Sequence, residues 1–206
     1  MRTFAVISLG CDKNRVDSER ILADLNGMFT LAEPEDAELI IVNTCAFIER
    51  AREEAVDTIL EVAQYKQNKC KKLIVTGCLA GMYADDIRTG IPEVDAIVPI
   101  ADYPNLKQIA AALFGETATC GTLASRLLTT PPHYAYLKIA DGCDNHCTYC
   151  MIPALRGPYR SVPIDDLIAE TESLAEDGVQ ELILVAQDVT RYGEDLYGNN
   201  KLLATF

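Results

Sequence analysis

Short runs of apolar and β-branched residues alternate with longer amphipathic segments from the N-terminus to Gly115. The short runs predict strands and the amphipathic segments predict helices. The predicted strands are residues 4–9, 38–43, 72–76 and 94–98. The predicted helices are residues 17–25, 48–64, 106–114 and a weaker one near Asp85 that ends before Pro92. This alternation predicts βαβ units and therefore an α/β fold, with an open, mainly parallel sheet flanked by helices.

The pattern breaks between residues 115 and 133, which are rich in Thr, Ser, Gly and Pro and include Pro131 and Pro132. Such a composition is typical of a linker, so we expect a domain boundary near residue 130, with domains at 1–130 and 131–206. A second β/α pattern follows the linker. It predicts a strand at 134–139, a cysteine-rich loop at 141–150, a helix at 164–177 and a strand at 181–185.

The net charge of the chain indicates which kind of binding partner to expect. The 206 residues include 31 Asp and Glu against 18 Lys and Arg, which gives a net charge of -13. Because nucleic-acid binding depends on basic side chains that neutralise phosphates, this excess disfavours a nucleic-acid partner. A basic protein, or a large assembly of complementary charge, is the better expectation.

The N-terminal segment has a short apolar stretch interrupted by Ser8 and lacks the pattern of a secretory signal. No apolar run reaches the roughly 18 residues that a membrane-spanning helix needs, so we expect no membrane association and a cytoplasmic location. Thiols stay reduced in that compartment. The eight cysteines therefore indicate metal binding or catalysis before disulfides.

Three of these cysteines, Cys11, Cys45 and Cys78, each follow a predicted strand and lie about one strand–helix repeat apart. Because the carboxyl ends of parallel strands meet at one edge of a sheet, we expect the three thiols to converge there. Gly10 and Gly77 suit positions where the backbone must turn tightly or approach a bulky ligand. The alternative for each cysteine taken alone is a small buried apolar residue. Convergence favours a soft metal centre, such as an iron–sulfur cluster with one open iron.

A second set, Cys143, Cys147 and Cys150, has the spacing C-x3-C-x2-C in the loop after the strand at 134–139. Such a loop can wrap three thiolates around a cluster and again leave one iron open. The alternative is zinc, which needs a fourth ligand. His146 is adjacent to Cys147 and cannot easily join the same tetrahedron. Cys70 and Cys120 fit neither set and are interpreted as ordinary thiols.

The C-x3-C-x2-C loop after the first strand of a β/α barrel resembles that of the radical S-adenosylmethionine (SAM) superfamily. Together with three upstream strand-end cysteines, it is similar to the methylthiotransferases of that superfamily. Residues 8–19, 135–143 and 185–193 resemble the branch that methylthiolates an aspartate of a small-subunit ribosomal protein. The tRNA-modifying branch usually has different residues in the first and last of these segments, and it remains an alternative, as does a nonenzymatic metal-binding scaffold.

The resemblance implies two 4Fe-4S clusters, SAM and an external electron donor. The cluster on Cys143, Cys147 and Cys150 would bind SAM and, once reduced, generate a radical that removes hydrogen from the β-carbon of the target aspartate. The cluster on Cys11, Cys45 and Cys78 would carry the sulfur that attacks that carbon, with a second SAM methylating the sulfur. The expected protein partner is a basic small-subunit ribosomal protein or the ribosomal subunit.

The resemblance also implies which residues contact SAM. Tyr149 would lie against the adenine, Gln187 and Asp188 would contact the cofactor, and Arg156 and Arg160 would bind the SAM carboxylate or the substrate. For Tyr149 the alternative is an aromatic ring that fills space, and for Gln187 and Asp188 it is a solvated loop. For the two arginines it is exposed charge that compensates acidic neighbours.

The length limits the second domain. A complete β/α barrel takes about 250 residues in eight units, whereas the part after residue 133 suffices for about two units. Residues 201–206 are typical of the start of another helix. We therefore expect the first units of an incomplete radical SAM barrel, a truncated chain, and little or no methylthiotransferase activity from this chain alone.

Overall fold

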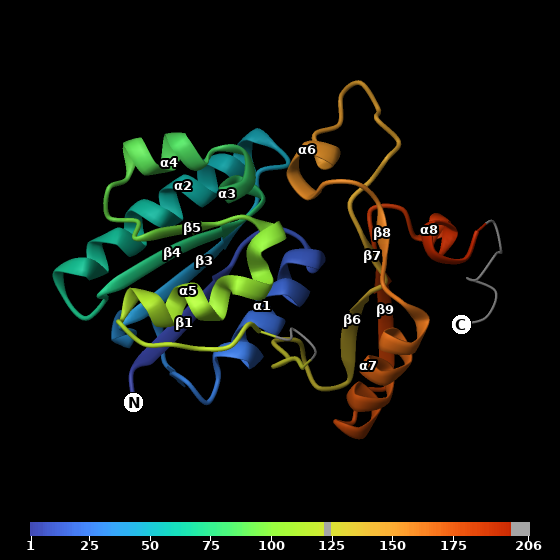
Figure 1. Ribbon diagram of the computed structural model, residues 1–206, viewed down its shortest axis with the longest axis horizontal. Coiled ribbons are helices and arrows are strands. Elements are labelled where there is room, and N and C mark those ends of the chain that lie inside the picture. The colour runs from blue at the N-terminus through green and yellow to red at the C-terminus, as the bar shows by residue number, and fades with distance from the viewer. Residues whose placement is uncertain (122–124, 199–206) are drawn as a thin grey trace. The chain divides into compact units, whose positions relative to one another are not determined.

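The computed structural model describes residues 1–121 and 125–198 (Figure 1). It divides into two compact units, Met1–Leu127 and Leu128–Phe206, called here the first and second units. The helix expected to start at residues 201–206 lies outside the described residues.

The first unit is built on a five-stranded parallel sheet with the strand order β2-β1-β3-β4-β5. The strands are β1 (Thr3–Ser8), β2 (Thr30–Leu31), β3 (Leu39–Thr44), β4 (Lys72–Gly77) and β5 (Ala96–Val98). Every residue of β3 is buried, as expected for a parallel strand that is covered on both faces. The predicted open parallel sheet is confirmed.

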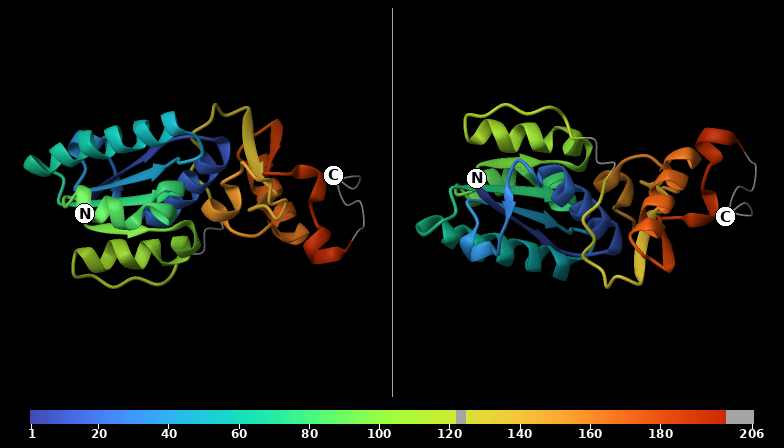
Figure 2. Two further views of the ribbon diagram at one scale, coloured as in Figure 1. Left: turned by 90° about the horizontal axis from the view of Figure 1, so that it is seen from above. Right: turned by 90° about the horizontal axis from the view of Figure 1, so that it is seen from below.

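Helices cover both faces of this sheet. They are α1 (Asp12–Leu25), α2 (Glu49–Ala63), α3 (Cys78–Met82), α4 (Ala84–Gly90) and α5 (Leu106–Leu113), with short 3-10 turns η1 (Pro34–Asp36), η2 (Gln64–Gln67) and η3 (Ile100–Asn105). Leu39 and Ile41 join the core cluster formed with α1 and α5. Because side chains alternate along a strand, Ile40 and Val42 point to the other face, where α2 packs. Figure 2 shows α2 and α5 on opposite faces.

The strand order places a topological switch point between β1 and β3. The chain leaves β1 towards β2 on one side and leaves β3 towards β4 on the other side. In doubly wound sheets, ligands bind outside the carboxyl ends of the strands at such a point. Sequence periodicity could not locate the switch point because β2 has only two residues and gives no detectable apolar run.

Several boundaries differ from the predicted ones. The helix expected at 17–25 begins earlier, at Asp12. The pattern missed its first turn because the residues there are polar, among them the buried Asn14, and give no apolar periodicity. The helix expected near Asp85 is α4, which ends at Gly90 before Pro92 as predicted. The short helix α3, directly after β4, was not predicted, and the strand expected at 94–98 begins at Ala96.

The second unit contains one βαβ unit and several short elements. Strands β6 (Tyr134–Lys138) and β9 (Glu181–Val185) pair in parallel and are connected through α7 (Ile164–Glu176). The short elements are the antiparallel pair β7 (Ala140–Asp141) and β8 (Arg160–Ser161), with α6 (Ile152–Arg156), η4 (Val189–Arg191) and α8 (Glu194–Tyr197). Leu137, Ile139, Leu167 and Tyr192 form its core. The expected first β/α units are confirmed.

None of the helices in the described ranges is long and apolar enough to cross a membrane.

A buried ion pair fixes the end of the first unit to α1. Arg126 Nε donates to Glu19 Oε2 at 3.1 Å, and the two side chains are only 3% and 0% exposed. The backbone N–H of Leu127 also donates to the Glu19 carbonyl at 3.1 Å. The segment that leads to the second unit is therefore packed into the first one.

Replacing only Arg126 should destabilise the first unit. We expect Arg126→Met to lower the free energy of unfolding by about 3–5 kcal/mol, because the buried Glu19 carboxylate loses the charge of Arg126. Chemical denaturation measures this loss. The double variant Glu19→Leu/Arg126→Met should recover most of it, and an equal loss in the double variant would contradict the interpretation.

Candidate metal centres

The register of the first-unit sheet aligns the segments that carry the first cysteine set. Ser8 pairs with Asn43, Asn43 pairs with Thr76, and Thr44 pairs with Gly77. Cys45 and Cys78 directly follow β3 and β4, and Cys11 follows β1 after a two-residue turn. The three cysteines therefore lie at the carboxyl edge, with Cys11 and Cys45 just after β1 and β3, the two strands that form the switch point.

Two glycines let these strand ends approach each other more closely than other residues would. A Cβ atom on Gly10 would lie 2.5 Å from Cys45 Cβ, and one on Gly77 would lie 2.4 Å from the Thr44 carbonyl oxygen. Both glycines also have positive φ angles, 89° and 91°. The positive φ angles agree with the tight turn expected at both glycines, and the close contact at Gly10 brings the turn before Cys11 against Cys45.

Buried amides hold the same edge together. Asn14 Nδ2 donates to the carbonyl oxygens of Leu9 and Thr44, each at 2.9 Å, and so joins the turn before Cys11 to the end of β3, before Cys45. Asn43 Nδ2 donates to the Asn14 carbonyl and to Ser18 Oγ, each at 2.9 Å. The apolar pattern of the sequence does not reveal this role of Asn14 and Asn43. A polar Asn at the end of a strictly apolar strand was the available signal.

Local structure also suits an anionic group at this edge. Cys11 is the N-cap of α1, where unpaired backbone N–H groups favour negative charge. Cys11 is exposed, whereas Cys45 and Cys78 are buried. Of the two remaining thiols, Cys70 is buried, which raises its pKa, and Cys120 is exposed. Neither has a place at the carboxyl edge in the register of the strands.

The second cysteine set lies on a loop whose two ends are held together. The Cys143 N–H donates to the Gly157 carbonyl at 3.1 Å, and the Tyr159 N–H donates to Asp144 Oδ1 at 3.1 Å. Within the loop, the Cys150 N–H donates to the Cys147 carbonyl at 2.9 Å. The thiols range from buried at Cys143, through intermediate at Cys150, to exposed at Cys147.

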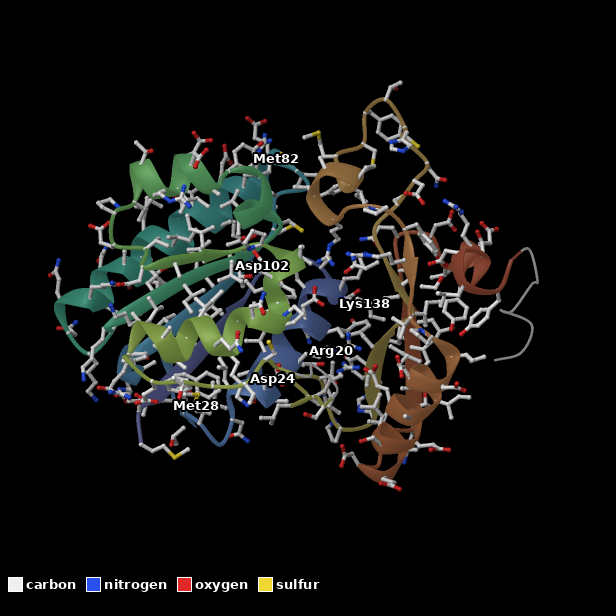
Figure 3. The ribbon with its side chains drawn as sticks, viewed as in Figure 1. Arg20, Asp24, Met28, Met82, Asp102 and Lys138 are labelled. Carbon is white, nitrogen blue, oxygen red and sulfur yellow. The ribbon has the colours of Figure 1, made fainter. Side chains whose placement is uncertain are left out.

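A buried charge cluster anchors the start of this loop. Asp141 forms ion pairs with Lys138, labelled in Figure 3, at 3.1 Å and with Arg156 at 2.8 Å. Asp141 Oδ1 also accepts the Gly142 N–H at 2.9 Å. Burial alone would raise the pKa of the Asp141 carboxyl, but the two cations outweigh burial and lower its pKa to about 2. Asp141 therefore stays ionised and ties the loop start to the end of α6.

The other residues expected to contact SAM differ in their burial and in their hydrogen bonds. Asp188 lies near the cysteine loop, since its side chain is hydrogen-bonded to Asn145 of that loop. The Tyr159 hydroxyl donates to the Asp188 carbonyl at 3.0 Å. Hydrogen bonds to the Asp188 carboxylate, first from Thr190 and also from Asn145, lower its pKa. Gln187 Oε1 is buried and accepts no hydrogen bond from the described residues. Tyr149 is 87% exposed.

The two candidate arginines differ. Arg156 is buried and bound to Asp141, so it is not the exposed compensating charge considered as the alternative. Arg160 lies on β8, opposite Asp141 in the strand register, and is exposed.

Each of the two donor sets consists of three thiols, and this chemistry fits an iron–sulfur cluster. Within residues 1–121 and 125–198, no three His, Cys, Asp or Glu side chains lie close enough together to hold one metal ion. In an iron–sulfur cluster each cysteine ligates a separate iron, so the thiols stand around the cluster instead of meeting at one point. Three thiols on adjacent strand ends, and three on one loop, are donor sets of this kind.

Comparison with known proteins gives two matches in tandem. Residues 3–99 match the uncharacterized protein family UPF0004, and residues 137–202 match the radical SAM superfamily. The chain is 48% identical to the ribosomal protein uS12 methylthiotransferase RimO of Clostridium tetani, over 97% of this chain and 47% of the relative. The proteins of the same name from Acetivibrio thermocellus and Caldicellulosiruptor saccharolyticus are 49% and 47% identical, over 98% and 97% of this chain.

The chain belongs to the radical SAM methylthiotransferase family. It spans about half the length of the curated relatives that it matches. The UPF0004 match covers the parallel sheet with the first cysteine set, and the radical SAM match covers the βαβ unit with the C-x3-C-x2-C loop. In this family member the two cysteine sets therefore lie in separately matched segments.

The close approach at Gly77 gives a direct test of the strand-end geometry. We expect Gly27→Ala to cost about 1–2 kcal/mol of stability from its positive φ alone. Gly77→Ala should cost a further 1–3 kcal/mol, roughly, because its Cβ would also collide with the backbone of Thr44. Gly27 is the matched control, since it has a φ of 94° and nothing within 4 Å of a Cβ. Equal losses by chemical denaturation would contradict the close approach.

The role of Asp141 can be tested at the backbone amides that it orders. Asp141→Asn keeps an oxygen that can accept the Gly142 N–H but removes the negative charge that pairs with Lys138 and Arg156. We expect faster hydrogen exchange at Gly142 and Cys143 and a loss of about 3 kcal/mol in the second unit. Asp165→Asn, which removes the same charge from an exposed site on α7, should leave this exchange unchanged. Unchanged exchange in Asp141→Asn would show that the ion pairs do not anchor the loop.

Proposed function

We propose that the chain carries the cluster-binding part of an enzyme that methylthiolates the β-carbon of an aspartate in ribosomal protein uS12. The observation that carries the proposal is the register of β1, β3 and β4, which aligns three cysteine-bearing strand ends, in a chain that also has a separate C-x3-C-x2-C loop. The names of the relatives support the reaction and the substrate. Both remain proposals for this chain.

In this proposal each cysteine set holds one 4Fe-4S cluster. Cys143, Cys147 and Cys150 hold the one that binds SAM, and Cys11, Cys45 and Cys78 hold the auxiliary one. When bound, the clusters and SAM supply the one-electron reduction, the hydrogen-abstracting radical, the sulfur and the methyl group. The electron comes from an external donor.

Other residues of the second unit position and bind SAM. Asp141 and Arg156 hold the base of the cysteine loop through their ion pair, so Arg156 is proposed to act on the loop and not directly on SAM. Gln187 Oε1 is a buried acceptor without a partner in the described chain, and we assign it to a donor group of SAM. Asp188 is held beside Asn145 of the same loop, which supports its assignment to the cofactor.

Two exposed side chains complete the proposed cofactor contacts. Tyr149 lies inside the cysteine motif and, being 87% exposed, has a ring available to cover the adenine. Arg160 is exposed and follows the loop that Asp141 and Arg156 close, so it is assigned to the SAM carboxylate or to the substrate.

The charge of the chain favours the protein substrate over tRNA. A net charge of -13 repels a phosphate backbone and attracts a basic ribosomal protein. The tRNA-modifying reaction and a nonenzymatic metal scaffold are the competing functions, and the two experiments below separate them.

Metal analysis tests the cofactors. After anaerobic reconstitution we expect about eight irons per chain, that is, two 4Fe-4S clusters. Cys45→Ala and Cys143→Ala should each remove about half of the iron, since each deletes a ligand of one cluster. Cys70→Ala is the matched control and should keep the full content. One zinc and no iron would overturn the proposal.

Product analysis tests the reaction. On reduction, the reconstituted protein should cleave SAM to 5'-deoxyadenosine, which a nonenzymatic scaffold would not do. Purified uS12 and tRNA are then offered side by side to a form with the length of the curated relatives. We expect the added methylthio mass, measured by mass spectrometry, on an aspartate of uS12. Addition to tRNA alone would assign the chain to the other branch.

A further inference from the structure

Four apolar side chains lie exposed along and just before helix α2. Phe47 and Ile48 are 52% and 56% exposed, and Val56 and Leu60 are 37% and 46% exposed. Val56 and Leu60 are one helical turn apart, so they share one side of α2. Scattered single apolar residues are normal on a protein surface, whereas a set aligned on one element indicates an interaction site. Figure 2 shows that α2 forms one outer layer of the first unit.

A ridge of carboxylates runs beside these apolar residues. Glu49, Glu53, Asp57 and Glu61 follow each other at intervals of one turn, and Glu54 lies nearby on the same exposed side. In the part of the chain that the structure describes, none of these five carboxylates forms an ion pair. Their charge is therefore available to a partner. Other acidic residues of the first unit, such as Asp36 and Asp95, are already neutralised by lysines.

The apolar and acidic residues together define what we call the α2 surface, and it is continuous with the first cysteine set. Phe47 and Ile48 lie in the segment that links Cys45 to α2, and Ile48 is the N-cap of that helix. With a rise of about 1.5 Å per residue, the side chains from Ile48 to Leu60 extend roughly 18 Å away from the Cys45 segment. A segment bound along α2 would therefore have one end at the candidate auxiliary cluster.

We propose that the α2 surface is the docking site for the basic protein substrate, which binds with lysines or arginines on the acidic ridge and apolar side chains on Val56 and Leu60. The proposal rests on the proposed function, because it takes uS12 as the partner. Charge complementarity favours this occupant: unpaired carboxylates attract a cationic polypeptide and repel the phosphates of RNA. The surface would guide uS12 towards the edge of the sheet that carries Cys45.

Binding measurements on the 206-residue chain test this proposal without any cluster chemistry. The probe is purified, fluorescently labelled uS12, titrated at low salt and followed by anisotropy. We expect Glu53→Lys/Asp57→Lys to weaken binding about tenfold or more, because like charges then face the basic partner. Val56→Ser/Leu60→Ser should weaken binding by a similar factor. Its remaining affinity should still fall with added salt, because the ridge is intact.

The matched control is Glu172→Lys/Glu176→Lys, which makes the same change of charge on exposed positions of α7. Its affinity for uS12 should stay within about twofold of wild type, a difference of less than about 0.5 kcal/mol, because these positions lie outside the α2 surface. An equal loss in this control would show that only net charge matters and would overturn the proposal. Wild-type affinity in both α2 variants, or binding of tRNA in place of uS12, would overturn it as well.

The same variants separate this proposal from the proposed function. The α2 variants change no cysteine, so after reconstitution they should keep wild-type iron content and SAM cleavage while their binding of uS12 falls. Normal iron and SAM cleavage with unchanged uS12 binding would overturn the docking site alone. Thermal denaturation checks that each variant is folded. If the charge-reversal variant unfolds, the milder variant Leu60→Ser replaces it and should also weaken uS12 binding.

Discussion

The parallel pairing of β1, β3 and β4 is the constraint on which the first cysteine site depends. Pairing in this register brings Thr44 opposite Gly77 and places the ends of all three strands at one edge. Asn14 then joins the turn before Cys11 to the end of β3, before Cys45, and Gly10 and Gly77 remove the Cβ atoms that would hold the strands apart. Without these contacts, cysteines from three distant parts of the chain would have no common location.

The two cysteine sets are supported in different ways. The first depends on long-range pairing within a sheet that is covered on both faces, so its geometry is determined by the whole unit. The second depends on one loop of consecutive residues, tied at its base by the buried ion pairs of Asp141 with Lys138 and Arg156. In this loop Cys147 and Tyr149 are exposed.

The sequence predicted the parts of this arrangement that follow from apolar periodicity. The main strands, the principal helices and the carboxyl-edge location of Cys45 all come from runs of buried residues. Periodicity could not predict β2, which has only two residues, nor the first turn of α1, where the buried Asn14 is polar. The Asp141 cluster was also missed, because its charged residues meet only after α6 folds back along the loop. The ion pair of Arg156 with Asp141 belongs to this cluster and could not be predicted from the sequence pattern.

The most direct test of the account is the metal content of the first cysteine set alone. A variant with Cys143, Cys147 and Cys150 all replaced by Ser is reconstituted anaerobically and analysed by native mass spectrometry. We expect one 4Fe-4S cluster per chain, about four irons, and loss of that cluster when Cys45 is replaced as well. Bound zinc, or a cluster that persists after the replacement of Cys45, would contradict the claim that the sheet edge gathers Cys11, Cys45 and Cys78 into one site.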